Sequence, residues 1–361
     1  MSRLIVIDFD ARPYDDETLL HEPLGGTQSA VLETCLALAD RADVTLYNAN
    51  DRERRVGRLT IRPNRAVSVP ELSSAEWIVF VSAFPQALLD RIPHRAGRPR
   101  LALWAHHDAD QAAVQCLARP SVLRQLAQFL CVSEWQKQRY CATFHVDPSA
   151  VAVVGNPYCR RALERTEWRP RSFDEPRLVH ASTPFRGLDV LVDAFPAFAA
   201  RFPGATLTVL SGMELYGSAD NAPYRALFEK IGRTPGIELG KPTGKLRLYG
   251  HLRDANALAH PSTFDETFCI VALEALVLGN TLMLGRGGAL PEVFPHARFV
   301  SRSPTRGAYA EAWSRFMIES WEEIAASPER EASSVAQAAA AAREQFSPEA
   351  VAGRVLRALS G

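Results

Sequence analysis

Short apolar runs alternate with helical patterns along most of this chain, and that alternation constrains its fold more than any other feature. Strands read as continuous apolar runs when helices cover both faces of a parallel sheet. The pattern therefore predicts an α/β protein with doubly wound parallel sheets. The expected strands are 4–8, 43–47, 77–82, 100–104, 129–133, 150–154, 177–181, 205–210, 236–239, 257–260 and 281–284. The expected helices are 29–39, 188–202, 269–278, 335–343 and 348–359.

The alternation is interrupted between Asn156 and Pro176, where prolines and charges replace the apolar periodicity. A length of 361 residues suits two domains of ordinary size, so this interruption is the expected linker. The resulting division is an N-terminal domain over 1–160, a linker over 161–176, a second domain over 177–335 and C-terminal helices over 336–361.

Charge and cysteine usage exclude several classes of protein. Basic and acidic side chains number 41 each, so the chain lacks the net basic field typical of nucleic-acid-binding proteins. The six cysteines form no C-x-x-C pair and no cysteine–histidine group with zinc spacing, which predicts reduced thiols and no metal site. No apolar run reaches the ~20 residues that cross a bilayer, so a cytoplasmic location is expected. The basic stretches 52–58 and 91–100 are interpreted as solvated loops, with peripheral membrane contact as the alternative.

Two glutamates eight positions apart form the strongest motif, in the segment 261–275. Glu266 stands just before an expected helix and Glu274 inside it, ~80° apart on a helical wheel. The strand before them ends at the edge where open α/β sheets bind ligands, and the free amides of a helix start attract a diphosphate. Glu274 lies on an apolar helix face, where a carboxylate needs a partner such as a sugar or ribose hydroxyl. The alternative is that Glu266 caps the helix and Glu274 is a surface charge.

This segment resembles the E-x7-E motif of retaining glycosyltransferases of family four, which adopt the GT-B fold. Further motifs resemble that family in the same order along roughly residues 1–300. They are Gly25-Gly26-Thr27-Gln28, Trp104-Ala105-His106-His107-Asp108, Val132-Ser133-Glu134-Trp135, Asn156-Pro157, Arg186-Gly187 and Gly287-Gly288-Ala289-Leu290-Pro291-Glu292. The resemblance implies two Rossmann-like domains facing across a cleft. The first would bind the acceptor, the second the nucleotide sugar, and the last helix would pack back onto the first domain.

The resemblance also implies roles for the residues that match its donor-binding motifs. Glu274 would hold the ribose hydroxyls, and Glu266 would face the donor sugar. Arg186 would pair with the diphosphate, because an arginine fork binds phosphate oxygens at two points. Gly25 and Gly26 would let backbone amides approach the same phosphates. The rest of the expected donor-binding set is Thr183, Thr267, Phe268, Cys269 and Ile270.

A histidine completes the expected catalytic set of His107, Glu266 and Arg186. By resemblance, His107 would lie in the cleft near the donor sugar. His106 is a rival for that place, because adjacent residues at a strand end point in opposite directions. By the same resemblance, Ser133 and Asn156 are further candidates, because their motifs resemble the last strands of the family's first domain.

The chain departs from the family pattern in three places. Many members carry an arginine shortly before the basic-glycine pair, whereas here the stretch is Ser182-Thr183-Pro184-Phe185. Cys269 occupies a position that is often glycine, which would narrow the pocket for the donor sugar. Two of only four lysines, Lys241 and Lys245, lie in one loop, which suggests that one of them replaces the missing phosphate cation. A solvated loop is the alternative.

The expected reaction transfers a hexose-type sugar from a UDP- or GDP-sugar with retained anomeric configuration. The resemblance implies that the leaving phosphate takes the acceptor's proton, and that neither a cofactor nor a metal is needed. The acceptor would be a glycan, a lipid-linked saccharide or a small molecule, within the biosynthesis of a cell-surface polysaccharide. The excess of arginine over lysine is typical of a high-GC bacterial source.

Three alternatives remain open. The first is another enzyme on the same fold, such as a nucleotide-sugar epimerase or a phosphorylase. The second is a nicotinamide-dependent dehydrogenase, whose G-x-G-x-x-G fingerprint directly after the first strand is absent here. The third is a catalytically silent sugar-nucleotide-binding protein, which the departures at Thr183, Pro184 and Cys269 leave open.

Overall fold

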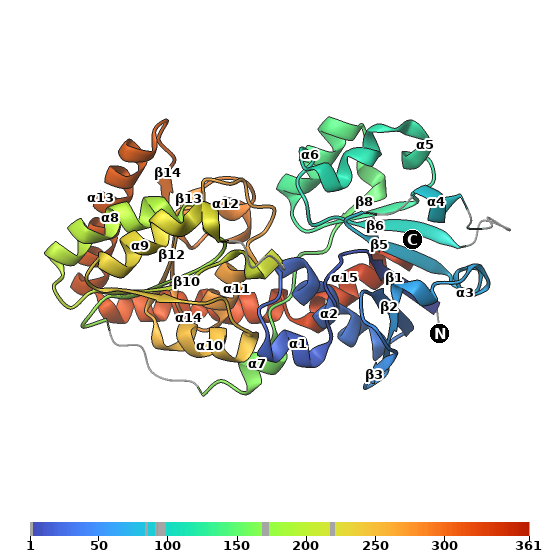
Figure 1. The fold of residues 1–361 in the computed structure, drawn as a ribbon, viewed down its shortest axis with the longest axis horizontal. Coiled ribbons are helices and arrows are strands. Elements are labelled where there is room, and N and C mark those ends of the chain that lie inside the picture. Colours follow the sequence, from blue (N-terminus) through green and yellow to red (C-terminus); the bar gives the residue numbers. More distant parts are fainter. Residues whose placement is uncertain are drawn as a thin grey trace. The chain divides into compact units, whose positions relative to one another are not determined.

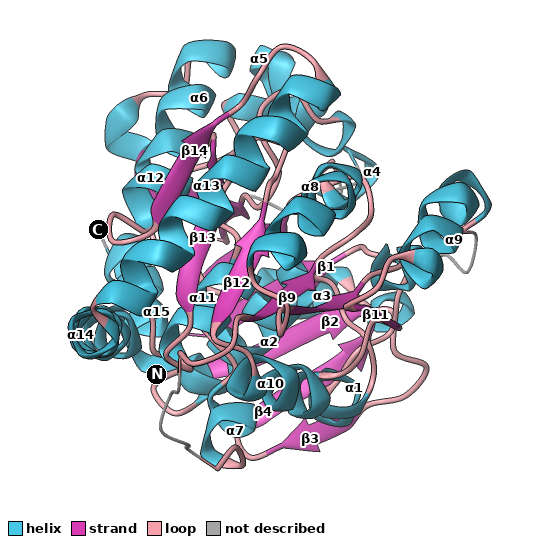
Figure 2. Ribbon diagram, turned by 90° about the vertical axis from the view of Figure 1, so that its left-hand side faces the viewer, coloured by secondary structure: helices cyan, strands magenta, loops and turns pink. Residues whose placement is uncertain are grey.

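The computed structural model describes residues 3–83, 86–90, 92, 99–167, 173–216 and 221–360. The chain divides into two compact units (Figure 1). Unit 1 comprises Met1–Glu17, Thr27–Pro157 and Phe346–Gly361, whereas unit 2 comprises Thr18–Gly26 and Tyr158–Gln345. Each unit is an α/β assembly around its own parallel sheet, so the predicted fold class is confirmed (Figure 2).

The described part of unit 1 contains an eight-stranded sheet in the order β3-β4-β2-β1-β5-β6-β7-β8. Neighbouring strands run parallel except β3 and β4, an antiparallel pair at one edge. The strands are β1 (Arg3–Asp8), β2 (Asp43–Asn48), β3 (Arg54–Val56), β4 (Leu59–Pro63), β5 (Trp77–Val81), β6 (Arg100–Trp104), β7 (Gln128–Cys131) and β8 (Val151–Val153). The helices are α2 (Gly26–Ala39), α3 (Val69–Ser73), α4 (Gln86–Leu89), α5 (Pro120–Leu123), α6 (Glu134–Phe144) and α15 (Pro348–Ser360).

The described part of unit 2 contains a six-stranded sheet in the order β11-β10-β9-β12-β13-β14, parallel throughout. The strands are β9 (Arg177–Ala181), β10 (Thr206–Leu210), β11 (Ile237–Gly240), β12 (Ala257–His260), β13 (Thr281–Arg286) and β14 (Arg298–Ser301). The helices are α7 (Arg160–Glu164), α8 (Leu188–Arg201), α9 (Arg225–Arg233), α10 (Lys245–Asp254), α11 (Ile270–Val277), α12 (Leu290–Val293), α13 (Arg306–Ala326) and α14 (Pro328–Gln345). A further helix, α1 (Asp16–His21), crosses the boundary between the units.

Helices cover both faces of the sheet of unit 2, with α8, α9 and α13 on one side and α10, α11 and α14 on the other (Figure 1). Large aromatic side chains fill the core beneath α8 and α13, among them the fully buried Phe195, Trp313 and Trp321. Burial on both faces explains why the central strands β12 and β13 are mostly apolar. The strands predicted in this half are all present, with ends shifted by at most two residues.

Several elements were not predicted. They include the β3–β4 hairpin, strand β14, and the helices α1, α6, α9, α10 and α13. The basic stretch 52–58, interpreted as a solvated loop, contains β3, and Arg54 forms ion pairs with Asp15 and Asp16. Most of the other basic stretch, 91–100, lies outside the described residues.

The unit boundaries differ in detail from the expected domains. Residues 18–26, expected in the first domain, group with unit 2, because Gly244 before α10 packs against the backbone of Leu20 and His21. The expected linker 161–176 includes most of α7 and is described only in part. Helix α15 belongs to unit 1, where Arg354 Nε donates to the carbonyl oxygen of Val154 at 2.7 Å. None of the helices in the described ranges combines the length and apolar character that a bilayer span requires.

Candidate functional site

The strand order of unit 2 reverses between β9 and β12, and the candidate site lies in the loops after these two strands. From β9 the chain continues to β10 and β11 on one side, whereas β13 and β14 follow β12 on the other. Such a switch point opens a crevice at the carboxyl ends of the strands, where open α/β sheets bind ligands. Arg186 follows β9 and Glu266 follows β12, so the topology brings together two residues 80 positions apart.

Two glycines allow these loops to approach each other. Gly187 has a φ of 86°, and a β-carbon there would lie 2.0 Å from the carbonyl oxygen of Pro261. Gly288 has a φ of 56°, and a β-carbon there would lie 2.3 Å from the carbonyl oxygen of Glu266. Any larger residue would push the two loops apart. This steric requirement explains the glycines in both the Arg186-Gly187 and the Gly287-Gly288 motifs.

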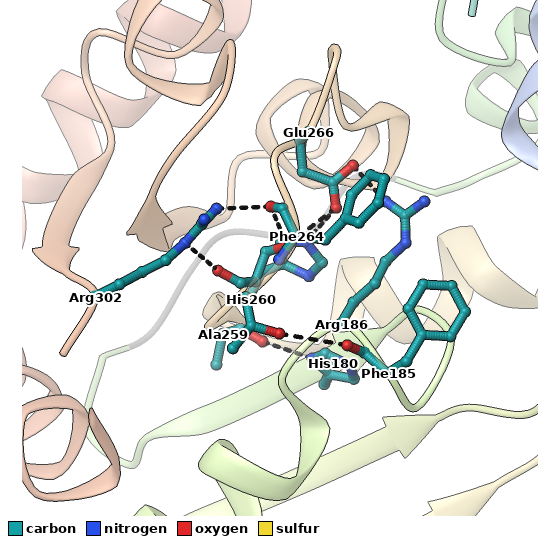
Figure 3. A network of polar contacts seen from close by, with 10 residues as sticks. His180, Phe185, Arg186, Ala259, His260, Phe264, Glu266 and Arg302 are labelled. Atoms are coloured by element: carbon teal, nitrogen blue, oxygen red, sulfur yellow. Dashed lines mark hydrogen bonds and ion pairs between the residues drawn. The ribbon is translucent and has the colours of Figure 1, made fainter. Parts of the chain in front are cut away.

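Arg186 and Glu266 form a partly buried ion pair at the centre of this network (Figure 3). The Arg186 guanidinium lies 4.9 Å from the ring centre of Phe264. The other carboxylate oxygen of Glu266 faces His260 Nε2 at 3.2 Å and Ser262 Oγ at 3.3 Å. Burial favours the protonated acid, but Arg186 and His260 outweigh it and lower the pKa of Glu266 to about 2. Glu266 is therefore ionised at neutral pH.

The loop that carries Glu266 is held from the back by Arg302. Arg302 Nε donates to the carbonyl oxygen of Ser262 at 3.0 Å, and its Nη2 donates to that of Phe264 at 2.7 Å (Figure 3). The Glu266 carbonyl oxygen accepts from the amide of Ala289 at 2.8 Å. These contacts fix the backbone on both sides of the carboxylate. Arg302 was not predicted from the sequence, because it lies 36 positions beyond Glu266 and outside the motifs considered above.

The start of α11 follows this loop directly. Its N-cap residue, Cys269, has a φ of 75° and makes no side-chain cap. The first backbone amides of a helix lack intrahelical acceptors, so an uncapped start offers donors to a ligand. A β-carbon on Gly26 would lie 3.3 Å from Ile270 Cδ1, which places the glycine loop against this helix start. The Phe268 side chain packs on Phe294, with ring centres 6.2 Å apart.

The two glutamates do not share a helix, which corrects the helical-wheel argument. Because α11 begins only at Ile270, Glu266 lies in the preceding loop and the wheel angle does not describe its direction. The alternative fails as well. Glu266 does not cap α11, and Glu274 is only 1% exposed, so it is not a surface charge.

Glu274 has two protein partners in the described part of the chain. Lys245 Nζ lies 2.8 and 2.9 Å from its two oxygens, and Tyr249 Oη donates to one of them at 3.3 Å. Lys245 is only 7% exposed, at the first position of α10. In this structure its ammonium group is therefore committed to Glu274, while Lys241 is exposed. The Thr183 hydroxyl is buried and has no hydrogen-bond partner among the described residues.

The histidine candidates lie in unit 1, just after β6. The His107 carbonyl oxygen accepts from Gln136 Nε2 at 2.8 Å and from Tyr140 Oη at 3.0 Å, so α6 fixes this turn. His107 Nδ1 is buried without a hydrogen-bond partner in the described part of the chain. Burial lowers the pKa of His107, against the opposing charge of Asp10. A neutral imidazole is therefore expected at neutral pH.

His106, Ser133 and Asn156 have structural contacts of their own. The His106 ring lies 5.3 Å from that of Trp104, and burial lowers its pKa to about 3 although a contact with Asn156 opposes the shift. Ser133 is the N-cap of α6, where its Oγ accepts from the Gln136 amide at 3.1 Å. Asn156 is buried. Ser133 therefore has a local structural role as a helix cap.

Burial of His106 makes stability depend on pH. Because its folded-state pKa is lowered, the unfolded chain takes up the proton first as the pH falls below ~6.5, and stability is lost. Replacing His106 by glutamine should reduce the loss of unfolding free energy between pH 7 and pH 5 by about 2 kcal/mol. Urea unfolding at both pH values measures this, with the exposed His296→Gln as control. An equal pH dependence in His106→Gln and wild type would contradict a neutral buried imidazole.

A cluster of His260, Glu266 and Cys269 was not expected from the sequence. His260 is fully buried, and its ring stacks on that of His180 with centres 5.7 Å apart. Burial opposes its charge, but Cys269 and Glu266 beside it raise the pKa of His260. The signal in the sequence was a histidine six positions before Glu266 and a cysteine three positions after it. That spacing matches none of the zinc patterns considered above.

Comparison with known proteins finds curated glycosyltransferases among the relatives of this chain. No protein-family model matches the chain. It is similar to the D-inositol 3-phosphate glycosyltransferase of Mycobacterium avium, 23% identical over 206 residues that cover 55% of this chain and 47% of that protein. The corresponding protein of Corynebacterium glutamicum is 31% identical over 150 residues, which cover 40% of this chain and 36% of the relative. The chain thus spans about half the length, or less, of the curated relatives it matches.

Solved structures match over the whole chain. Sucrose-phosphate synthase from Thermosynechococcus elongatus has a TM-score of 0.70 at 17% identity, covering 100% of this chain and 99% of that one. The Anabaena protein HepE, in complex with UDP and glucose, has a TM-score of 0.69 at 15% identity. The match covers 100% of this chain and 100% of that one. Likeness at such identity concerns the fold alone. Together with the two parallel-sheet units, it shows that this chain has the GT-B fold.

Proposed function

We propose that this protein is a glycosyltransferase that moves a hexose-type sugar from a nucleotide-diphosphate sugar to an acceptor. One observation carries the proposal: Arg186 and Glu266 meet at the strand-order switch point, directly before the uncapped start of α11. A cation, a carboxylate and the amides of a helix start, placed together at one switch point, suit a diphosphate joined to a sugar. The similarity to inositol-phosphate glycosyltransferases, and the UDP and UDP-glucose complexes of HepE, support it.

Arg186 is the proposed partner of the diphosphate. Its guanidinium is held by Glu266 and the Phe264 ring, so it is oriented before any ligand arrives. Preorganised charge of this kind stabilises the charge that develops on a leaving phosphate without reorganisation at the moment of reaction. The amides of Phe268, Cys269 and Ile270 would donate to the same ligand, and the loop at Gly25 and Gly26 would approach its phosphates.

Glu266 would accept from hydroxyls of the donor sugar, and Glu274 from the ribose. Both carboxylates are already paired inside the protein, Glu274 with Lys245 and Glu266 with Arg186. Each retains lone pairs, because an ionised carboxylate has about four acceptor positions. The pairing fixes the direction of the remaining lone pairs, and these would favour a nucleotide sugar bound in one orientation.

The proposed transfer retains the anomeric configuration. The leaving phosphate would take the acceptor's proton on the same face, so that positioning and electrostatics supply the rate enhancement. On this proposal the transfer step needs no metal, because Arg186 and the helix amides carry the leaving-group charge. The acceptor would be a glycan, a lipid-linked saccharide or a small molecule, and the buried Thr183 hydroxyl is a further candidate contact to the donor. Retention is tested by comparing the anomeric proton couplings of product and donor by NMR.

Thermal unfolding in the presence of UDP, GDP, dTDP, ADP, CMP and NAD tests the donor site. We expect one nucleoside diphosphate to raise the melting temperature selectively, since a ligand at ~100 times its dissociation constant adds ~2.7 kcal/mol. Glu274→Gln, which keeps an acceptor oxygen near Lys245, should lose most of this shift. The exposed Glu238→Gln, on β11 of the same unit, is the matched control and should keep it.

Two results would overturn this function. One is the absence of a shift with any diphosphate, and the other is a shift with NAD alone, which would favour a dehydrogenase. Incubation of the bound nucleotide sugar without acceptor separates the remaining alternatives. A changed sugar still attached to the nucleotide would indicate an epimerase, whereas slow release of the free sugar is expected of a transferase.

A further inference from the structure

Three side chains of different chemistry meet beside the Arg186–Glu266 pair. One ligand atom each from His260, Glu266 and Cys269 lies within 4.8 Å of the other two. His260 is fully buried, Glu266 is 4% exposed and Cys269 is 9% exposed. All three come from the end of β12 and the loop before α11, whose backbone is fixed by Arg302 and Ala289. The cluster therefore belongs to a rigid part of unit 2.

The spacing of the ligand atoms fits a small tetrahedral ion. His260 Nε2 and Glu266 Oε1 lie 3.2 Å apart. Two ligands at ~2.0–2.1 Å from a zinc ion, at a tetrahedral angle, would be ~3.3 Å apart. An imidazole nitrogen, a sulfur and a carboxylate oxygen also form a donor set that suits zinc and excludes magnesium and calcium, which prefer oxygen alone.

The surroundings already orient the carboxylate. Arg186 holds the oxygen of Glu266 that faces away from His260, and Ser262 Oγ lies 3.3 Å from the oxygen that faces it. Hydrogen-bonded partners of this kind are usual for carboxylates that bind metals, because they fix the direction of the free lone pair. A ligand position is thus prepared on the His260 side of Glu266.

Cys269 provides an independent sign of a specialised site. Its φ of 75° lies in the left-handed region that favours glycine, so a side chain there costs on the order of 1 kcal/mol. That conformation places the thiol within reach of His260 and Glu266. Strained backbone that positions a reactive side chain occurs preferentially at functional sites.

We propose that His260, Glu266 and Cys269 form a binding site for a divalent ion of the zinc class. The three protein ligands leave one tetrahedral position for an outside ligand. Binding displaces the proton on His260 Nε2 and the thiol proton of Cys269, and both protons are released to solvent. The site shares Glu266 with the proposed donor site, but it does not rest on the proposed function, because metal binding is measured without a nucleotide sugar. It also departs from the expectation of no metal, which rested on the cysteine and histidine spacing and on the family resemblance.

Cobalt substitution tests the ligand set. The full chain, freed of metal by a chelator and returned to buffer, is titrated with Co²⁺ and then with Zn²⁺. We expect one Co²⁺ per chain, visible and near-ultraviolet bands typical of a tetrahedral site with a thiolate ligand, and displacement by equimolar Zn²⁺. Mg²⁺ and Ca²⁺ should displace nothing, because neither prefers sulfur.

Cys269→Gly is the decisive variant, because glycine fits the observed φ and should keep the fold. It should remove the thiolate band and weaken zinc binding by about 100-fold or more. Cys141→Ser, a half-buried cysteine on α6 in the other unit, is the matched control and should change neither. Unchanged zinc affinity in Cys269→Gly, or no binding by wild type, would overturn the proposal. Neither result depends on nucleotide binding, so the metal site and the transfer reaction can fail separately.

Discussion

Replacing Lys245 by methionine is expected to lower the free energy of unfolding by about 3–5 kcal/mol. The variant leaves Glu274, 1% exposed inside α11, without the ammonium group 2.8 Å away. Tyr249 Oη, at 3.3 Å, is the remaining partner and cannot neutralise the carboxylate. A buried charge without its partner carries the desolvation penalty alone. Urea unfolding measures the change, followed by intrinsic fluorescence to which the buried Trp313 and Trp321 contribute.

A double variant separates the lost charge pairing from lost packing. Lys245→Met combined with Glu274→Leu replaces the ion pair with apolar side chains of similar size, and such replacements are often neutral. We therefore expect the double variant to be more stable than Lys245→Met, which gives a large coupling energy in the double-mutant cycle. The control is Lys230→Met, since Lys230 is half exposed where it pairs with Asp193 and should cost about 1 kcal/mol or less. Equal losses of unfolding free energy in Lys245→Met and Lys230→Met would contradict a stabilising role for the buried Lys245–Glu274 pair.

The sequence predicted what depends on local pattern. Short, mostly apolar runs predicted the strands β9 and β12, and Arg186 and Glu266 lie in the loops that follow these strands. Parallel strands place all their carboxyl ends at one edge, so two residues 80 positions apart could be assigned to one site without a contact being known. Gly187 was predicted as part of a motif. Only the structure shows why a glycine is needed there: the carbonyl oxygen of Pro261 leaves no room for a β-carbon.

Contacts between distant segments could not be predicted. Lys245 was expected in a solvated loop or on a phosphate, because nothing in residues 241–245 indicates that a helix begins there and turns the side chain inward. Its partner Glu274 is 29 positions away on another helix, and the choice of that partner depends on how α10 packs on α11. The cluster of His260, Glu266 and Cys269 was not predicted for another reason. Cys269 joins it through a left-handed backbone conformation that usually requires glycine.

Replacing Arg186 by alanine is expected to lower the rate of nucleoside diphosphate release from the donor by about 10³-fold. On the proposed function this side chain stabilises the charge that develops on the leaving phosphate, an interaction stronger in the transition state than in the ground state. The catalytic constant should therefore fall far more than donor affinity. The rate is measured as release of the diphosphate from a nucleotide sugar that carries the base identified by thermal unfolding, and equilibrium titration measures the affinity.

Two further variants distinguish catalysis from folding. Arg186→Ala also leaves the buried Glu266 with His260 as its only remaining basic partner among the described residues, so part of any loss reflects stability. Arg186→Lys keeps a cation for Glu266 but lacks the planar fork that binds two phosphate oxygens. It should retain the stability of wild type and still lose about tenfold or more in rate. Arg201→Ala, at the end of α8 in an exposed pair with Glu322, should change neither quantity. One result would contradict the proposed role: Arg186→Ala lowers the stability, but its folded fraction releases the diphosphate at the rate of wild type. Arg186 would then be a structural partner of Glu266, and the leaving group would need another cation.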